Sequence, residues 1–170
     1  MVQPMQTTKL SNSLYLTFRL ADEVFGLEIL SVKEILEYRE LTAIPTSPEY
    51  IRGVINLRGQ AIPVIDLTVK FGGNHKDITS RSCIVIIETL NQSNRRDIGF
   101  LVDAVDEVVE IPTENIEPAP SFGTNIRLDY ISGMGNVNDS FIIILNPHQI
   151  VSDFKVEYDR EHGMKIKTAA

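Results

Sequence analysis

The β-strand pattern of this chain is most distinct in Tyr50-Ile-Arg-Gly-Val-Ile-Asn-Leu-Arg-Gly-Gln-Ala-Ile-Pro-Val-Ile-Asp-Leu67. Two runs of β-branched and apolar residues flank its centre, Asn56-Leu57-Arg58-Gly59, where Asn and Gly favour a tight turn. Pro63 cannot donate to a β-ladder, so it should lie at an edge or where its nitrogen faces away from a neighbouring strand. The pattern therefore predicts a β-hairpin over Gly53–Leu67.

The glycines of this hairpin also raise the question of a phosphate-binding loop. Such a loop needs glycines followed by Lys and Ser or Thr at the start of a helix. Gly59 is instead followed by Gln60-Ala61-Ile62-Pro63 and a strand, so phosphate binding is not supported. Taken singly, Gly53 and Gly59 are better explained by the turn, and Arg58 by an ion pair, than by a partner.

The hairpin recurs once in the chain. The segment Tyr50–Asn56, with the strand that follows it, matches Tyr130–Asn136 at a constant offset of 80 residues. Upstream, Phe25-Gly26-Leu27 matches Ile98-Gly99-Phe100 at an offset of 73 residues. Several landmarks in the same order predict a duplicated unit.

Each half then has the same order of elements: a strand, a turn, a return strand that carries glycine, an ambiguous segment, a proline-bearing loop and a hairpin. The first strands are 14–20 and 83–89, and the second turn, 91–97, reads as a longer polar loop. The ambiguous segments, 29–36 and 102–109, have helical spacing in the first copy, although a strand is the rival interpretation. Short strands separated by Gly, Pro and Asn are typical of small barrels.

The predicted fold class is thus all-β with short helices, built from two five-stranded β-barrel subdomains. Their expected bounds are about 14–72 and 83–151, with a seam near Phe71–His75. Halves of this kind can exchange strands, so each barrel need not be a continuous segment. His148–Phe154 is expected to form a short helix, and residues 1–13 and 155–170 are expected to be flexible ends.

Composition excludes several classes of function. The chain has 170 residues and a formal net charge of -7, which argues against a nucleic-acid partner. A secretory signal is not expected, because the N-terminus lacks an apolar core region, and the apolar runs are too short to span a bilayer. With one cysteine, no intrachain disulfide can form. These features predict a soluble, cytoplasmic protein without direct membrane insertion.

The residues that usually carry chemistry are scattered. His75, His148 and His162 do not have the spacing of a metal site, and no nucleophile elbow is present. The densest acidic cluster lacks the register of a calcium loop and is expected to be a solvated face; it comprises Asp103, Asp106, Glu107 and Glu110. We therefore expect no catalytic residue, no metal and no cofactor.

The order of motifs resembles the CheW family of bacterial chemotaxis coupling proteins. The signature hairpin Ile51–Leu67 is closely similar to that of the family. Four further segments also match: Glu23–Ile35, Ile98–Val108, Ile116–Phe122 and Tyr130–Gly135. The resemblance covers roughly Leu14 to Val151, as a single domain.

The resemblance implies two barrels of the Src-homology-3-like kind and a non-enzymatic adaptor. Proteins of this family link the cytoplasmic hairpin of methyl-accepting chemoreceptors to the regulatory domain of the histidine kinase CheA, in arrays at the membrane. The length of this chain fits a free-standing adaptor. An alternative is a CheW-like adaptor of a non-flagellar pathway, for example one controlling pilus motility. A rival of another class, a ligand-binding or catalytic barrel, would need a pocket with convergent polar groups.

The resemblance also implies two sets of contact residues. The receptor groove lies between the barrels, with Val32 and Val108 as its apolar floor and an ion pair between Glu34 and Arg58; the matching positions are Val32, Glu34, Gly53, Arg58, Gly99 and Val108. The kinase-facing surface is centred on Phe122, with Glu117 and Ser121 beside it, and the charges there depart from the family's pattern. In the second copy Asn138 and Asp139 replace Arg58 and Gly59, which favours Arg58 as a receptor contact.

Overall fold

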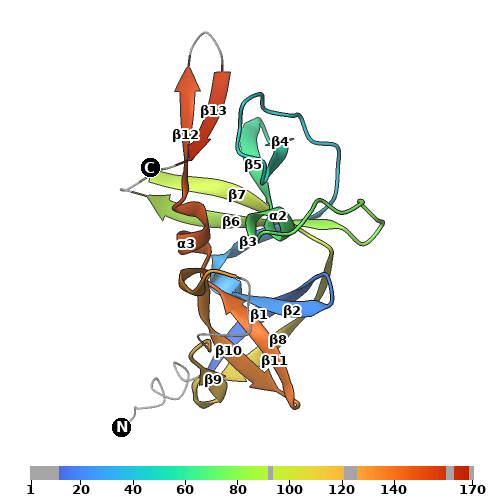
Figure 1. Ribbon diagram of the computed structural model, residues 1–170, viewed down its shortest axis with the longest axis vertical. Coiled ribbons are helices and arrows are strands. Elements are labelled where there is room, and N and C mark those ends of the chain that lie inside the picture. Colours follow the sequence, from blue (N-terminus) through green and yellow to red (C-terminus); the bar gives the residue numbers. More distant parts are fainter. Residues whose placement is uncertain (1–11, 92–93, 121–125, 160–162, 169–170) are drawn as a thin grey trace.

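The computed structural model describes residues 12–91, 94–120, 126–159 and 163–168. A six-stranded sheet, here sheet A, has the order β8-β1-β2-β11-β10-β9, and a five-stranded sheet, sheet B, has the order β3-β6-β7-β5-β4. Figure 1 shows sheet B above sheet A, with the hairpin β12–β13 projecting beside sheet B. The elements are β1 Asn12–Leu20, β2 Glu23–Glu28, η1 Ile29–Ser31, β3 Val32–Glu37, β4 Ile51–Leu57, β5 Gln60–Asp66, α2 Leu67–Lys70, β6 Cys83–Asn91, β7 Asn94–Val102, β8 Ala104–Pro112, η2 Thr113–Asn115, β9 Ile116–Glu117, η3 Leu128–Tyr130, β10 Ile131–Val137, β11 Ser140–Leu145, α3 Pro147–Val151, β12 Phe154–Asp159 and β13 Gly163–Thr168.

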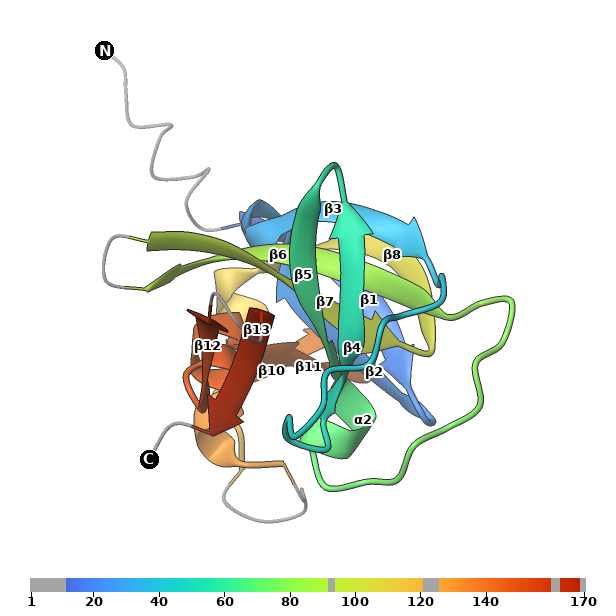
Figure 2. The same cartoon turned by 90° about the horizontal axis from the view of Figure 1, so that it is seen from above.

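Each sheet takes strands from both halves of the sequence. The first half places β1 and β2 in sheet A and β3 to β5 in sheet B, whereas the second half places β6 and β7 in sheet B and β8 to β11 in sheet A. The division at about 14–72 and 83–151 therefore does not separate the two subdomains, and strand exchange, which the sequence left open, is what the structure shows. Residues 71–82 form a long loop along the outside of sheet B (Figure 2).

The sequence repeat is visible in the ladders. β11 runs parallel to β2 with Ile144 opposite Gly26, and β5 runs parallel to β7 with Val64 opposite Gly99. The hairpins β4–β5 and β10–β11 each contain a register shift at the glycine that follows the first residue pair. The duplication predicted from the sequence is thus confirmed strand by strand.

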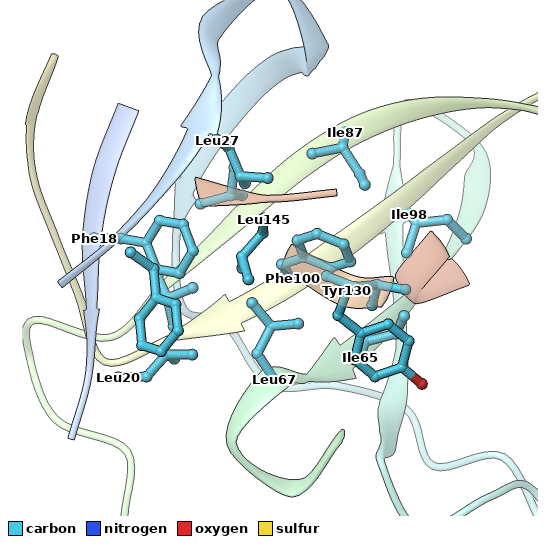
Figure 3. Packing of buried hydrophobic residues seen from close by; sticks show 14 of the residues in the cluster. Phe18, Leu20, Leu27, Ile65, Leu67, Ile87, Ile98, Phe100, Tyr130 and Leu145 are labelled. Atoms are coloured by element: carbon cyan, nitrogen blue, oxygen red, sulfur yellow. The ribbon is translucent and has the colours of Figure 1, made fainter. Parts of the chain in front are cut away.

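Three apolar clusters stabilise this arrangement. The largest joins the two sheets, and Phe18, Leu27, Phe100 and Leu145 meet there from strands of both (Figure 3). A second cluster around Ile84 and Ile86 fills sheet B, and a third around Ile111 and Ile144 fills sheet A. Burial of apolar area at the shared cluster stabilises the contact between the two sheets.

A polar cluster bridges the subdomains beside the shared apolar core. The Lys70 side chain, at the end of α2, is only 4% exposed; its Nζ donates to Asp153 Oδ2 at 3.1 Å and lies 4.0 Å from the ring centroid of Tyr50. Arg127 and the Tyr130 hydroxyl also donate to Asp153. Burial lowers the pKa of Lys70, although Asp153 opposes this shift. Burial, together with the bond to Asp153, raises the pKa of Tyr130 above its usual range.

Several local predictions are corrected. The ambiguous segment 29–36 is a single turn of 3-10 helix followed by strand β3, and 102–109 lies mainly in β8. The expected loop 91–97 is mostly strand, because β6 and β7 pair as far as Asn91 and Asn94. The expected short helix is α3, which ends at Val151.

The tail is also corrected. Phe154–Thr168 contains the antiparallel hairpin β12–β13 rather than a loose end. Phe154 and Ile166 are buried in the shared cluster, and this burial offsets the entropy of ordering a charged segment. The charged residues of this segment are typical of a loose end, but apolar residues alternate with them as in a strand.

Candidate functional site

The turn of the β4–β5 hairpin consists of Arg58 and Gly59, with φ of 51° and 82°. Two successive positive φ values fit the type I′ turn that matches the twist of a hairpin. The Gly59 amide donates to Asn56 Oδ1 at 3.0 Å, which fixes the turn as the sequence predicted. The nitrogen of Pro63 faces away from β4, because its partner Val54 exchanges both backbone bonds with Thr42 instead.

The predicted ion pair between Arg58 and Glu34 is present. Arg58 Nη2 donates to Glu34 Oε1 at 2.9 Å and Nη1 donates to Oε2 at 3.0 Å, a bidentate geometry. The bond from Arg58 lowers the pKa of Glu34. Because Glu34 lies on edge strand β3 and Arg58 on the β4–β5 turn, the pair joins the two outer strands of sheet B and closes it towards a barrel.

The predicted apolar floor lies where the shared cluster reaches the surface. Val32 pairs with Ile87 on β6, and Val108 pairs with Leu16 on β1; both partners belong to the shared cluster. Directly paired residues point to the same face of a sheet. Val32, on edge strand β3 of sheet B, and Val108, on edge strand β8 of sheet A, therefore both border the shared cluster. The Val108 side chain is 47% exposed.

Three further exposed apolar residues were missed by the sequence reasoning. Leu14 lies two residues from Leu16 on the same face of β1, Leu30 is in η1, and Ile35 pairs with Val85 of the shared cluster. Leu30 is 88% exposed. The register shift between Val32 and Glu34 is what brings Ile35 to the same face as Val32, and it could not be read from the sequence.

The two predicted glycines are buried beneath the chain's own residues. A Cβ at Gly99 would lie 2.8 Å from Ile84 Cγ2 and 3.2 Å from Val64 Cγ2, inside sheet B. At Gly53, where φ is +151°, it would lie 2.7 Å from the Thr42 carbonyl oxygen. These contacts give both glycines a packing role, and their part in receptor binding stays a prediction.

The kinase-facing prediction falls mostly outside the described residues, because Phe122 and Ser121 belong to 121–125. Glu117 is described: it is exposed on the two-residue strand β9, opposite Met134 of β10. Nearby, β10, β11 and the β1–β2 turn line a cavity of about 530 Å³ whose rim includes Phe141, 53% exposed.

The described residues contain no cluster of three or more His, Cys, Asp or Glu able to hold a metal ion. No helix within the described ranges is long and apolar enough to cross a membrane. The fold and its exposed features therefore define a duplicated β-sheet module whose candidate site is a surface bordering a shared core.

Comparison with known proteins agrees with this class. The CheW-like domain family matches residues 14–155. The chain is 33% identical to the chemotaxis protein CheW of Klebsiella aerogenes over 138 residues, 81% of each chain. It is also 33% identical to a probable chemotaxis protein CheW of Rhizobium etli, covering 84% of this chain and 89% of the relative. The crystal structure of the scaffolding protein TtCheW from Thermoanaerobacter tengcongensis superposes with a TM-score of 0.74 at 36% identity, covering 87% and 89% of the two chains.

This chain belongs to the CheW-like domain family and is a chemotaxis scaffold protein. The predicted family and the predicted fold class are confirmed by these matches.

Proposed function

We propose that this protein is a non-enzymatic adaptor that couples the cytoplasmic hairpins of chemoreceptors to the regulatory domain of the histidine kinase CheA. It acts in the cytoplasm and is recruited to receptor arrays at the membrane. Family membership supports the scaffold role. The observation that carries the proposal is the group of exposed apolar residues where edge strands β3 and β8 border the shared cluster.

The receptor segment is an antiparallel pair of helices, and its apolar face fits this border. Both sheets supply apolar contacts to a helix pair that lies across the junction between them. Sheet B contributes Val32 and Ile35, and sheet A contributes Val108. Leu14 and Leu30 extend the apolar area at the same junction, since η1 lies against both β1 and β6. An amphipathic helix buries such area with side chains spaced three and four residues apart.

Arg58 gives this surface its polar contact. Its side chain is 71% exposed even while paired with Glu34, so the remaining guanidinium donors are open to a partner. Gly53 and Gly99 allow close packing within sheet B on the side of its second cluster, so any support that they give to the surface is indirect. Glu117 and the exposed Phe141 mark a separate face for the kinase.

The test is co-sedimentation of the full chain with a receptor signalling fragment and with CheA from the same host. We expect wild type to bind each partner, Val108→Asp to lose the receptor fragment, and Phe141→Asp to lose CheA alone. Leu90→Asp, which changes a side chain that is 61% exposed on β6 near the end of the β6–β7 hairpin, is the matched control and should bind both. The coupling role is wrong if wild type binds neither partner.

A further inference from the structure

The repeat places a groove at corresponding positions of the two sheets. The groove of sheet A, about 530 Å³, lies between the N-terminal ends of β2 and β11, before the point where the two strands begin to pair in parallel. The groove of sheet B, about 430 Å³, lies between the N-terminal parts of β7 and β5, before these two strands begin to pair in parallel. Through the repeat offsets, Asp22 and Glu23 of the first groove correspond to Arg95 and Arg96 of the second. We call them groove A and groove B.

In each groove the two diverging strands form two walls, and the third wall differs between the grooves. In groove A it includes Ala119 and Pro120, which follow β9, whereas in groove B it consists of Val156 and Met164 from the hairpin β12–β13. The hairpin is held by the buried Phe154 and by a bond from Arg96 Nη1 to the Val156 carbonyl oxygen at 3.3 Å. The match to the family model ends at residue 155, so this wall lies beyond the matched domain.

The rims of the two grooves carry opposite charge. Asp22 and Glu23 are the ionisable residues that line groove A. Groove B is lined by Arg95, by Arg96 and by Asp97. The Arg95 side chain is 76% exposed although its Nη1 lies 4.0 Å from Glu88 Oε1 outside the groove lining. Asp97 is 12% exposed at its side chain and is paired with Lys33 Nζ at 2.9 Å, so the charge that groove B presents to solvent is positive.

Groove B also offers backbone groups. β7 pairs with β6 along its whole length, but its ladder with β5 begins only at Gly99. The β5-facing edge of β7 therefore borders the groove from Arg95 to Ile98. An extended segment can add to such an edge through main-chain bonds, while pockets on either side select its side chains.

We propose that groove B is a docking site for an extended, acidic segment of a partner protein, with the hairpin β12–β13 supplying its apolar wall. Apolar side chains of the segment contact Val156 and Met164, and its carboxylates face Arg95. The site extends the proposed scaffold role with another protein surface, and it does not depend on receptor or kinase binding.

The probes are short fluorescein-labelled peptides of alternating valine and glutamate, and the same peptides with lysine in place of glutamate. Fluorescence anisotropy with the full chain should show binding of the glutamate peptide that weakens as salt is raised. Arg95→Glu should shift the affinity ratio towards the lysine peptide by at least ~10-fold, or about 1.4 kcal/mol. The matched control Arg81→Glu changes a side chain that is 69% exposed elsewhere, and it should leave the ratio unchanged.

Met164→Asp should lose the glutamate peptide and Met164→Leu should keep it, with circular dichroism confirming that both variants retain the wild-type fold. Arg95 is chosen over Arg96 because Arg96 also holds the hairpin. The proposal is overturned if wild type does not bind the glutamate peptide, if Arg95→Glu leaves the ratio unchanged, or if folded Met164→Asp binds as wild type does. Each of these results is independent of whether the chain binds CheA.

Discussion

Asp153→Ala tests the polar cluster that ties the two subdomains together. Asp153 accepts from Lys70, Arg127 and Tyr130, and Lys70 is almost completely buried. Removing the carboxylate leaves the Lys70 ammonium buried without a counter-charge. Loss of one partner of a buried pair typically costs about 3–5 kcal/mol, because the remaining charge keeps its desolvation penalty.

The surroundings of Asp153 and Lys70 favour a loss of stability at the lower end of that range. The Asp153 side chain is 26% exposed, so water can replace part of the lost contact, and Lys70 keeps its position over the Tyr50 ring. We expect Asp153→Ala to lower the free energy of unfolding by about 3 kcal/mol, which for a chain of this size lowers Tm by roughly 6–12 °C. Lys70→Met removes the buried ammonium together with its ion pair to Asp153. It should therefore lower the free energy of unfolding by less than ~1.5 kcal/mol.

The assay is urea unfolding followed by far-ultraviolet circular dichroism, on the two single variants and the double variant. The double variant should be more stable than Asp153→Ala alone, because without the Lys70 ammonium no buried charge is left without a counter-charge. The reasoning is refuted if Asp153→Ala unfolds within about 0.5 kcal/mol of wild type, or if the two effects simply add.

Three further predictions follow from the structure. Gly53→Ala should lower the free energy of unfolding in urea by about 1–3 kcal/mol, because a Cβ there meets the Thr42 carbonyl oxygen. Gly59→Ala should lower it by no more than the backbone strain of about 1–2 kcal/mol, because nothing lies within 4 Å of a Cβ there. Equal losses for the two variants, larger than this strain, would contradict the packing argument. Arg58→Asn should leave stability unchanged or slightly raised, and should weaken co-sedimentation with the receptor fragment; unchanged binding would remove Arg58 from the site. Burial raises the pKa of Asp153, but hydrogen bonds from Tyr130 and Lys70 outweigh this and lower it, so the unfolded chain binds more protons in acid. Stability from Asp153 is then present above its unfolded pKa near 4 and lost as pH falls below it, and the urea midpoint should drop less between pH 5 and pH 3 in Asp153→Ala than in wild type.

The sequence was informative where a local rule determines the structure. The Arg58-Gly59 turn and the offset repeats could be predicted from the residues, because turn chemistry acts within a few residues and duplication repeats whole segments. The Glu34–Arg58 pair, whose members are 24 residues apart, was predicted from the family resemblance alone. The assignment of strands to sheets could not, since it depends on long-range pairing such as β1 with β8 and β3 with β6. Neither pairing has a local signature.

The same limit applies at the candidate site. The close packing around Gly99 and Gly53 could not be predicted from the sequence, and their part in receptor binding stays a prediction. Ile35 was missed because one extra residue in β3 turns it towards the shared cluster. The hairpin at the C-terminal end was missed because its apolar residues are separated by charged ones. The buried Phe154 and Ile166 and the bond from Arg96 to the Val156 carbonyl oxygen show that it is anchored.

The conformation of Arg58 argues for a role outside folding. A residue with a Cβ at φ of 51° costs on the order of 1–2 kcal/mol, and the equivalent turn uses Asn138, which tolerates this region better. An exposed ion pair returns only about 0–1 kcal/mol, so the bond to Glu34 does not offset the strain. Arg58 is therefore expected to give the isolated chain no net stability over asparagine, and this favours an interaction of its side chain that forms when a partner binds. We propose that this interaction is the receptor contact, which Arg58→Asn tests.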